Sequence, residues 1–271
     1  MHPMLNIAIR AARAAGNQIL RYANRIDTLT ISKKQHNDFV SEVDRIAEQE
    51  IIQIIRKAYP HHTILAEESG EREGSAKGRG ESYVWIIDPL DGTTNFLHGF
   101  PQYAVSVALQ RNGELDQAVV YDPLRNELFT ASRGSGALLN DRRIRVSRRD
   151  GLDGALLGTG FPFRDLRFLE AYLAMFKDLL PKTAGVRRAG AAALDLAYVA
   201  AGRLDGFWEM GLKPWDIAAG ALIIQEAGGV VSDFSGGREF LQTGNVVAGP
   251  VKLHPQIVKA IKPHLIDEIR R

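Results

Sequence analysis

The sequence predicts an α+β protein whose two halves differ in style. In the first half, up to residue 148, two amphipathic helices precede closely spaced strands that are joined by short turns such as Asn112-Gly113. Strands joined by such turns form hairpins, so we expect an antiparallel sheet there. In the second half, strands alternate with helical segments, which predicts an α/β arrangement. We expect residues 1–148 and 149–271 to form one compact unit.

Two helices are expected before the first buried strand. Apolar residues recur at helical spacing from Leu5 onward, so the first helix should end near Ala23. The second helix should open near Ser41 and end before Pro60, because proline cannot continue a helix. A short strand at 28–32 should lie between the two helices.

The other elements follow from the same signals of spacing and turn residues. The glycine-rich segment 69–81 should be an exposed loop that could form a flap over a functional site. Gly228-Gly229 should end a helix with a left-handed cap. The remaining strands are expected at 64–66, 83–87, 103–110, 115–121, 127–132, 142–146, 155–158, 207–209, 230–232 and 246–248, and the remaining helices at 166–180, 191–201, 215–227 and 255–266.

The strongest functional signal is the stretch WIIDPLDGTTNF at 85–96. Its apolar residues predict a buried strand that ends at Asp88, since Pro89 cannot donate a hydrogen bond to a sheet. Asp91 brings a second carboxylate, and two close acids repel unless a cation such as Mg²⁺ or Mn²⁺ lies between them. Backbone N–H groups from Gly92 onward, at a helix start, would favour an anion. We expect adjacent metal and phosphate sites, with an ordinary surface turn as the alternative.

Three other acids allow both a structural and a functional interpretation. Asp44 lies three residues after Ser41, as in a capping box, and from spacing alone we favour the cap over catalysis. Asp216 falls in the first turn of the helix at 215–227, where it could equally cap that helix or bind a ligand. Glu209 ends an apolar strand, and burying a carboxylate without a partner is costly, so we interpret Glu209 as a ligand contact.

The composition excludes several kinds of chemistry. Because the chain of 271 residues has no cysteine, disulfides, thiolate catalysis and cysteine-based zinc sites are excluded. The net charge is only +2 and the basic residues are dispersed, so nucleic-acid binding is allowed but not indicated. We interpret the arginine cluster at 142–149 as a solvated hairpin edge. The start of the chain lacks the regions of a signal peptide, and no apolar run is long enough to span a membrane, which predicts a cytoplasmic protein.

Several motifs together resemble the inositol monophosphatase family. The resemblance runs from the first expected helix to the last, and it implies the family fold, a layered αβαβα sandwich. A bacterial branch of the family is the most similar in its additional motifs. The family motifs are Glu67-Glu68, 85–96, WDIAAG at 215–220 and EAGG at 226–229, and those of the bacterial branch are GTGFPFR at 158–164 and RRAGA at 187–191.

The resemblance implies a Mg²⁺-dependent phosphatase that hydrolyses myo-inositol monophosphate and uses two or three ions per site. A third, weaker ion would lie near Glu67, and Asp44 would be catalytic rather than a helix cap. The implied metal ligands are Glu67, Asp88, the carbonyl of Leu90, Asp91 and Asp216. The implied catalytic residues are Thr93, Asp44 and Glu67, and the implied substrate contacts are Asp91, Gly92, Thr93, Ala192, Glu209 and Asp216.

The resemblance also implies partners. The substrate would be a small phosphorylated polyol, and the protein would be a homodimer that does not bind membranes. Members of the bacterial branch are implied to contact RNA polymerase or antitermination factors in ribosomal RNA transcription. Related phosphatases that act on sugar phosphates or 3′-phosphonucleotides share the metal motif, so they remain alternatives.

Overall fold

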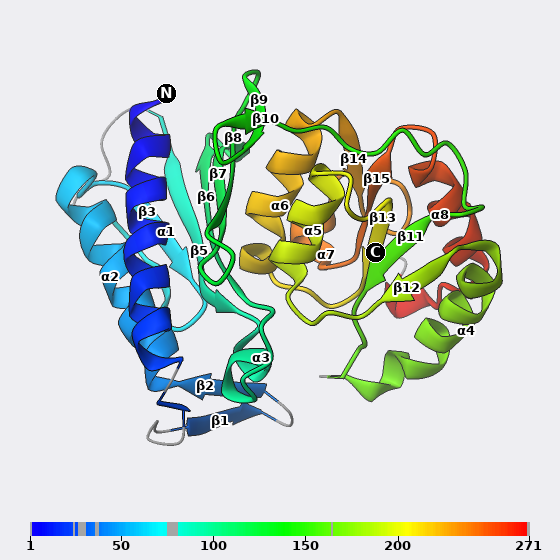
Figure 1. Ribbon diagram of the computed structural model, residues 1–271, viewed down its shortest axis with the longest axis horizontal. Coiled ribbons are helices and arrows are strands. Elements are labelled where there is room, and N and C mark those ends of the chain that lie inside the picture. The colour runs from blue at the N-terminus through cyan, green and yellow to red at the C-terminus, as the bar shows by residue number, and fades with distance from the viewer. Residues whose placement is uncertain are drawn as a thin grey trace.

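The chain folds into alternating layers of helix and sheet in the order αβαβα, as expected (Figure 1). The computed structural model describes residues 2–23, 25–26, 31–35, 38–74, 81–163 and 165–269, with the backbone alone for 31–35 and 38–41. The outer layers are α1 (Pro3–Tyr22) with α2 (Glu42–Ala58) on one side and α4 (Leu169–Leu179) with α8 (His254–Ile261) on the other, and the central layer is α5 (Ala192–Ala200) with α6 (Pro214–Glu226).

The first sheet has eight strands in the order β10-β9-β8-β7-β6-β5-β3-β4. All neighbours are antiparallel except β3 and β5, so the antiparallel sheet expected for the first half is confirmed. The strands are β3 (Thr63–Ala66), β4 (Gly70–Arg72), β5 (Tyr83–Asp91), β6 (Ala104–Arg111), β7 (Glu114–Asp122), β8 (Glu127–Ser132), β9 (Gly136–Leu139) and β10 (Arg142–Arg143).

Helices cover both faces of the middle of this sheet, so the side chains that alternate along its central strands are buried on either face. On β5, Trp85 and Ile87 pack with α1 and α2, whereas Ile86 packs on the other face with α5 and α6. Trp85 and Ile87 are fully buried and Ile86 nearly so. The near-continuous apolar run that the sequence shows here is therefore the signature of a strand covered on both sides.

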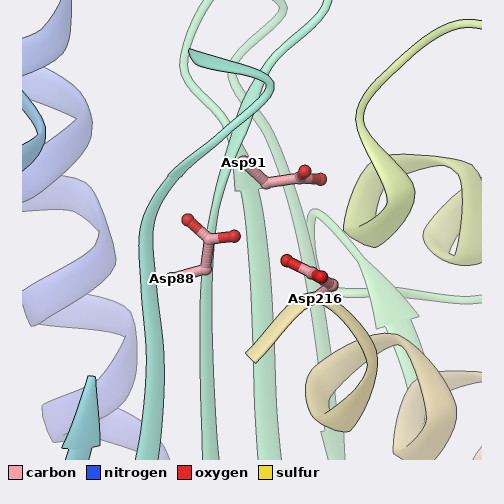
Figure 2. A group of neighbouring side chains, drawn as sticks. All are labelled: Asp88, Asp91 and Asp216. Carbon is pink, nitrogen blue, oxygen red and sulfur yellow. The ribbon is translucent and has the colours of Figure 1, made fainter. Parts of the chain in front are cut away.

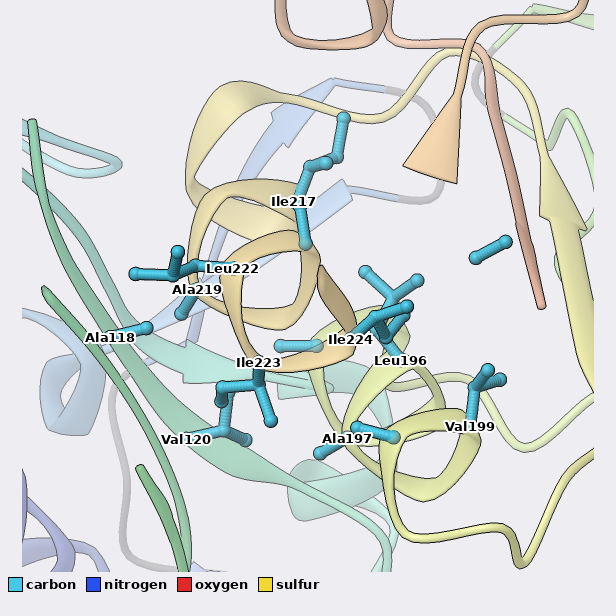
Figure 3. Close-up of a cluster of buried hydrophobic side chains, with 14 of the residues drawn as sticks. Ala118, Val120, Leu196, Ala197, Val199, Ile217, Ala219, Leu222, Ile223 and Ile224 are labelled. Carbon is cyan, nitrogen blue, oxygen red and sulfur yellow. The ribbon is translucent and has the colours of Figure 1, made fainter. Parts of the chain in front are cut away.

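The central helices are buried because they lie between two sheets. Figure 3 shows Ile223 of α6 close to Val120 of β7, and Leu196 of α5 beside α6. The two helices approach closely at Gly220, where an added Cβ would lie 2.5 Å from the Cβ of Leu196. A helix that is apolar all round has to be covered on all sides, and α6 is buried from Asp216 to Ile224.

The second sheet has five strands in the order β12-β11-β13-β15-β14. Strands β11–β12 and β11–β13 are parallel, while β13–β15 and β14–β15 are antiparallel, so this half mixes crossover helices with a hairpin. Its outer face packs on α4 and α8 through Trp208, which stacks on Tyr172. The strands are β11 (Leu156–Thr159), β12 (Gly185–Arg187), β13 (Gly206–Glu209), β14 (Gly229–Ser232) and β15 (Val246–Pro250).

Some local predictions are wrong. The strand expected to end at Asp88 continues to Asp91, with a register shift between these residues that contains Pro89. A register irregularity leaves ladder positions unpaired, so a proline without an N–H is tolerated there. The loop expected at 69–81 begins with β4, and residues 75–80 lie outside the described residues, so the flap stays a prediction.

Other differences involve short elements. Of the strand expected at 142–146, only Arg142–Arg143 (β10) forms, and it pairs with β9, which was not predicted; the exposed arginines of β10 do lie at the sheet edge as expected. The strand expected at 28–32 lies mostly outside the described residues, and β1 (Ile31–Gln35) pairs with an unexpected β2 (Asp38–Ser41). Strand β12 and the short α7 (Phe240–Thr243) were not predicted. The helix expected at 166–180 is α4 flanked by 3₁₀ turns at Leu166–Phe168 and Leu180–Lys182.

Candidate active site

Three carboxylates from both halves of the chain meet between the first sheet and α6 (Figure 2). Asp88 and Asp91 lie at the end of β5, and Asp216 lies in the first turn of α6. Each offers an oxygen within 4.8 Å of the others, and all three side chains are buried. The two acids of the sequence motif thus meet a third acid that lies more than a hundred residues further along the chain.

Each of the three carboxylates is oriented by a backbone N–H group. Asp88 accepts a hydrogen bond from the N–H of Leu90 at 2.9 Å, and Asp91 accepts one from the N–H of Ala193 at 2.8 Å. Asp216 accepts one from the N–H of Lys213 at 2.7 Å, immediately before its own helix. Asp216 therefore caps α6 and also faces the site, so the two interpretations of this residue are compatible.

The electrostatics of this group favour a bound cation. Burial raises the pKa of Asp88 well above its usual value, and the nearby charges of Glu67, Asp91 and Asp216 raise it further. Burial and the charge of Asp216 likewise raise the pKa of Asp91. Three buried carboxylates that oppose one another's ionisation match the oxygen ligands that Mg²⁺ prefers. The donor set therefore fits a hard divalent ion.

Glu67 lies at the edge of this group. It is half-buried, lines the same cavity, and follows β3, where its N–H donates to the carbonyl of Ile87 at 3.1 Å. Its charge acts on the pKa of Asp88, yet its carboxylate is not within the tight group of three. The structure thus brings Glu67 to the site that the resemblance implied, but less closely than Asp88, Asp91 and Asp216.

Thr93 and Asp44 form a hydrogen-bonded pair beside the carboxylates. The Thr93 hydroxyl lies 2.8 Å from Asp44 Oδ1 and 3.0 Å from the carbonyl oxygen of Leu90, both of which accept hydrogen bonds. Asp44 is fully buried on α2. A hydroxyl whose proton is held by a carboxylate presents its lone pairs to another donor, such as a water molecule. The pair can therefore orient a nucleophilic water.

Gly92 allows a tight turn between β5 and α3 (Thr93–Leu97). Its φ of 91° lies in the left-handed region, and an added Cβ would lie 2.8 Å from the carbonyl oxygen of Gln102. A side chain is excluded here on both grounds. Gly92 and Thr93 both line the cavity.

A cavity of about 740 Å³ opens over these residues. Glu209 on β13 and Ala192 on α5, the two expected substrate contacts outside the motif and the carboxylate group, lie in its wall. Burial raises the pKa of Glu209 well above its usual value, and the charges of Asp195 and Asp216 add to this effect. A Cβ on Gly160 would overlap the Glu209 carboxyl group, so that glycine makes room for the acid.

Sequence reasoning missed two functional candidates. The pKa of Asp195 on α5 is raised to about 8, because the effect of burial exceeds the opposing effect of the nearby Arg188 guanidinium. Arg188 lines the cavity and lies over the rings of Phe161 and Phe163, at 5.0 and 5.7 Å from their centroids. Asp195 is a lone acid in the apolar run AAALDLAYVA, which is the same signal that pointed to Glu209, whereas Arg188 stands in the RRAGA motif of the bacterial branch, to which the resemblance assigned no role.

The fold and the site define a class of layered α/β proteins with a group of buried carboxylates, suited to a metal ion, between a sheet and a central helix. Within that class, the chain belongs to the inositol monophosphatase family, whose model matches residues 1–265. It is 59% identical to the Nus factor SuhB of Pseudomonas aeruginosa over 273 aligned positions that cover all of both chains. The resemblance to a bacterial branch of the family is thereby confirmed.

Solved structures agree with this assignment. The extragenic suppressor protein suhB from Bartonella henselae superposes with a TM-score of 0.93 at 44% identity, covering 97% of this chain and all of that one. An IMPase from Thermotoga maritima gives a TM-score of 0.86 at 36% identity and covers 97% of this chain and 98% of its own. The family and these structures support a phosphatase. None of the helices in the described part of the chain is long and apolar enough to cross a membrane.

Proposed function

We propose that this protein hydrolyses myo-inositol monophosphate to myo-inositol and phosphate with the help of Mg²⁺. The observation that carries the proposal is the meeting of Asp88, Asp91 and Asp216 beside the Thr93–Asp44 pair at the foot of one cavity. Glu67, Asp88, Asp91, Asp216 and the carbonyl of Leu90 would hold two or three ions. Bound Mg²⁺ would supply an acidified water molecule and neutralise charge on the phosphate and the leaving alkoxide.

The residues of the chain would do the positioning. The hydroxyl of Thr93, whose proton is held by Asp44, would accept a hydrogen bond from the attacking water and pass a proton to the Asp44 carboxylate. The N–H groups of Gly92 and Thr93 would hold phosphate oxygens. Uncatalysed hydrolysis of a phosphate monoester is so slow that rate enhancements reach about 10²¹-fold, so precise orientation of water and phosphate is needed.

Substrate hydroxyls would bind on the opposite wall of the cavity. Glu209 offers a carboxylate and Ala192 its backbone in the cavity wall, and Asp91 and Asp216 of the carboxylate group could also accept from substrate hydroxyls. A polyol presents several hydroxyl donors, and buried carboxylates that lack enough donors are costly. The surplus of acceptors in this wall fits a small phosphorylated polyol better than an apolar substrate.

The first experiment measures phosphate release from inositol, sugar and adenosine phosphates with and without a chelator. We expect myo-inositol monophosphate to be preferred and activity to depend on Mg²⁺. Asp91→Asn and Asp216→Asn should each abolish release without unfolding the protein, while Asp153→Asn, which alters an exposed acid outside the cavity, should not change it. Full activity in Asp91→Asn would refute the site, and strong preference for adenosine 3′,5′-bisphosphate would refute the substrate.

A second function has support from the comparisons. Two relatives at 59% and 54% identity, from Pseudomonas aeruginosa and Escherichia coli K12, are named Nus factor SuhB. We therefore propose a binding role with RNA polymerase or antitermination factors, in the cytoplasm, that coexists with catalysis. Purified RNA polymerase should bind wild-type protein and Asp91→Asn equally; a loss of binding in the variant would tie this role to the chemistry of the site.

A homodimer is the third part of the proposal. Apolar side chains gather on one surface near the cavity, where Phe161, Leu166 and Leu173 are 45%, 60% and 46% exposed. Exposed apolar side chains that lie together are typical of an interaction surface. Light scattering after gel filtration should give twice the mass of the chain, and Leu166→Lys should shift the protein to the monomer.

A further inference from the structure

A second buried acid on α2 contacts the site from behind. Glu48 is 3% exposed and lies one helical turn after Asp44, so both carboxylates are on the same face of the helix. Asp44 accepts a hydrogen bond from Thr93, and Glu48 Oε2 accepts one from the N–H of Glu68 at 2.7 Å. One helix face thus contacts two separate segments of the candidate active site.

The contact between Glu48 and Glu68 fixes a short turn. Residues 67–69 connect β3 to β4, and the register pairs Ala66 with Gly70 across this turn. The N–H of Glu67 continues the pairing of β3 with β5 by donating to Ile87. The next N–H group, that of Glu68, does not pair within the sheet but donates to the Glu48 carboxylate. The backbone on both sides of the Glu67 side chain is therefore held, once by the sheet and once by Glu48.

A buried carboxylate is an expensive way to satisfy one backbone N–H group. Burying a carboxyl group is costly, and the hydrogen bond that Glu48 accepts from the N–H of Glu68 offsets part of this cost. Such a cost is understandable if the turn has to be held accurately because it carries a metal-binding residue. Groups that orient metal ligands typically change metal affinity by about 10- to 100-fold when they are altered.

We propose that Glu48 is a positioning residue that holds Glu67 at the metal site through the N–H of Glu68. The inference rests on the proposed function, because it assumes that Glu67 contributes to Mg²⁺ binding. Glu48 itself would touch neither metal nor substrate. Its role would be to keep the Glu67 carboxylate at a fixed distance from the buried group of Asp88, Asp91 and Asp216.

Two substitutions separate position from charge. Glu48→Gln removes the charge but keeps an oxygen at the same reach, so it can still accept from Glu68. Glu48→Asp keeps the charge but withdraws the carboxylate by one methylene, so it cannot. Mg²⁺ binding to the full chain is measured by isothermal titration calorimetry without substrate, and thermal unfolding with chelator present checks the fold.

We expect Glu48→Asp to weaken Mg²⁺ binding about tenfold or more and Glu48→Gln to stay within about threefold of wild type. In a Glu67→Gln background, Glu48→Asp should have less than a twofold further effect, because the two residues act through one contact. The same affinity in Glu48→Asp as in wild type would overturn the inference. So would a greater loss in Glu48→Gln than in Glu48→Asp, which would indicate a role for charge.

The outcomes separate this inference from the proposed function. A wild-type protein that binds no Mg²⁺ refutes the proposed function, whereas normal binding that ignores Glu48→Asp refutes only the role of Glu48. If Glu48→Asp does not fold, Glu48→Ala, which has no acceptor oxygen, replaces it. A loss of Mg²⁺ affinity of about tenfold or more then supports the role of the acceptor oxygen, and wild-type affinity overturns it.

Discussion

At the scale of single residues, the candidate site is a group of acids whose negative charges repel one another unless a cation is bound between them. Burial and mutual repulsion raise the pKa values of Asp88 and Asp91, with Asp216 among the causes for both. A ligand that binds the folded state alone stabilises that state, and the gain grows with the logarithm of the ligand concentration above the dissociation constant. The metal should therefore contribute to stability as well as to chemistry.

Removal of Mg²⁺ should lower the thermal stability of the wild-type protein. At a concentration about 100 times the dissociation constant, Mg²⁺ should add about 2.7 kcal/mol to the free energy of unfolding. Asp216→Asn should remove most of this gain, while Asp153→Asn should keep it. Differential scanning calorimetry with Mg²⁺ and with chelator measures the effect, and an equal gain in Asp216→Asn would contradict the assignment of Asp216 as a ligand.

The Thr93 hydroxyl should matter for rate rather than for folding. Thr93→Val keeps the shape of the side chain but removes the hydrogen bonds to Asp44 and Leu90. We expect phosphate release to fall by about 10²- to 10⁴-fold, the usual contribution of a positioned proton acceptor. Thr93→Ser should recover much of the rate. A valine variant with normal turnover would show that the pair does not orient the water.

The pH dependence of stability should include a contribution from His62. This histidine stacks between Tyr59 and Tyr83 and accepts a hydrogen bond from Trp85 Nε1 at 3.1 Å. Burial, then the charges of His61 and Arg56, lower its pKa. The unfolded chain therefore binds the proton more readily, so this stability is complete above about pH 6.5 and is lost as the pH falls toward the lowered value.

His62→Gln isolates that contribution, because glutamine can still accept from Trp85 but does not titrate. Between pH 7.5 and pH 5.5, the free energy of unfolding should fall further in wild type than in the variant. Urea denaturation at both pH values measures the difference. Equal losses in the two proteins would show that His62 is not protonated on unfolding in this range.

At the scale of elements, the position of Asp216 depends on how closely α6 approaches α5. Gly220 is the contact point, since an added Cβ would lie 2.5 Å from Leu196. Gly220→Ala should cost about 1–3 kcal/mol of stability through overpacking and should weaken Mg²⁺ binding by displacing the start of α6. Gly151→Ala is the control, because its added Cβ would meet only Gln256, at 3.7 Å.

Urea denaturation and calorimetric titration of the two glycine variants check this prediction. A Gly220→Ala protein that loses stability but binds Mg²⁺ normally would mean that α6 adjusts without moving Asp216. A protein unchanged in both measurements would show that the two helices have more freedom than their packing indicates.

The sequence was sufficient where a local signal marks the element. Asp88 and Asp91 stand at the end of an apolar strand, and the turn at Gly92 follows directly, so both were found from neighbouring residues. Short strands such as β12 have too few residues to show a period, and they exist because β11 supplies their hydrogen bonds. Pro89 was misjudged because the register irregularity that tolerates it is defined by the partner strand β6.

The residues that support the site could not be predicted from the sequence, for a related reason. Glu48 is one of several acids on an amphipathic helix, and its position in the sequence does not indicate that it accepts a hydrogen bond from Glu68. The approach of Asp216 to Asp91 likewise needed the family resemblance, because it joins two halves of the chain. Local chemistry was predictable, whereas its convergence depends on tertiary packing.

At the scale of the whole molecule, the two halves share one core. A single buried cluster contains Ile86 and Phe129 from the first sheet together with Leu196 and Ile223 from the central helices. We expect one cooperative unfolding transition, with coincident fluorescence and circular dichroism curves in urea. Separate transitions would indicate that residues 1–148 and 149–271 are independent domains.

The last consequence concerns synthesis on the ribosome. Asp88 and Asp91 emerge early, but Asp216 begins the helix that covers the inner face of the first sheet, and it emerges after most of the chain. Until then that sheet presents an uncovered apolar face, which invites aggregation or a chaperone. A nascent chain therefore cannot complete the candidate site before its core is closed, so we expect Mg²⁺-dependent phosphate release only from chains that are almost entirely made.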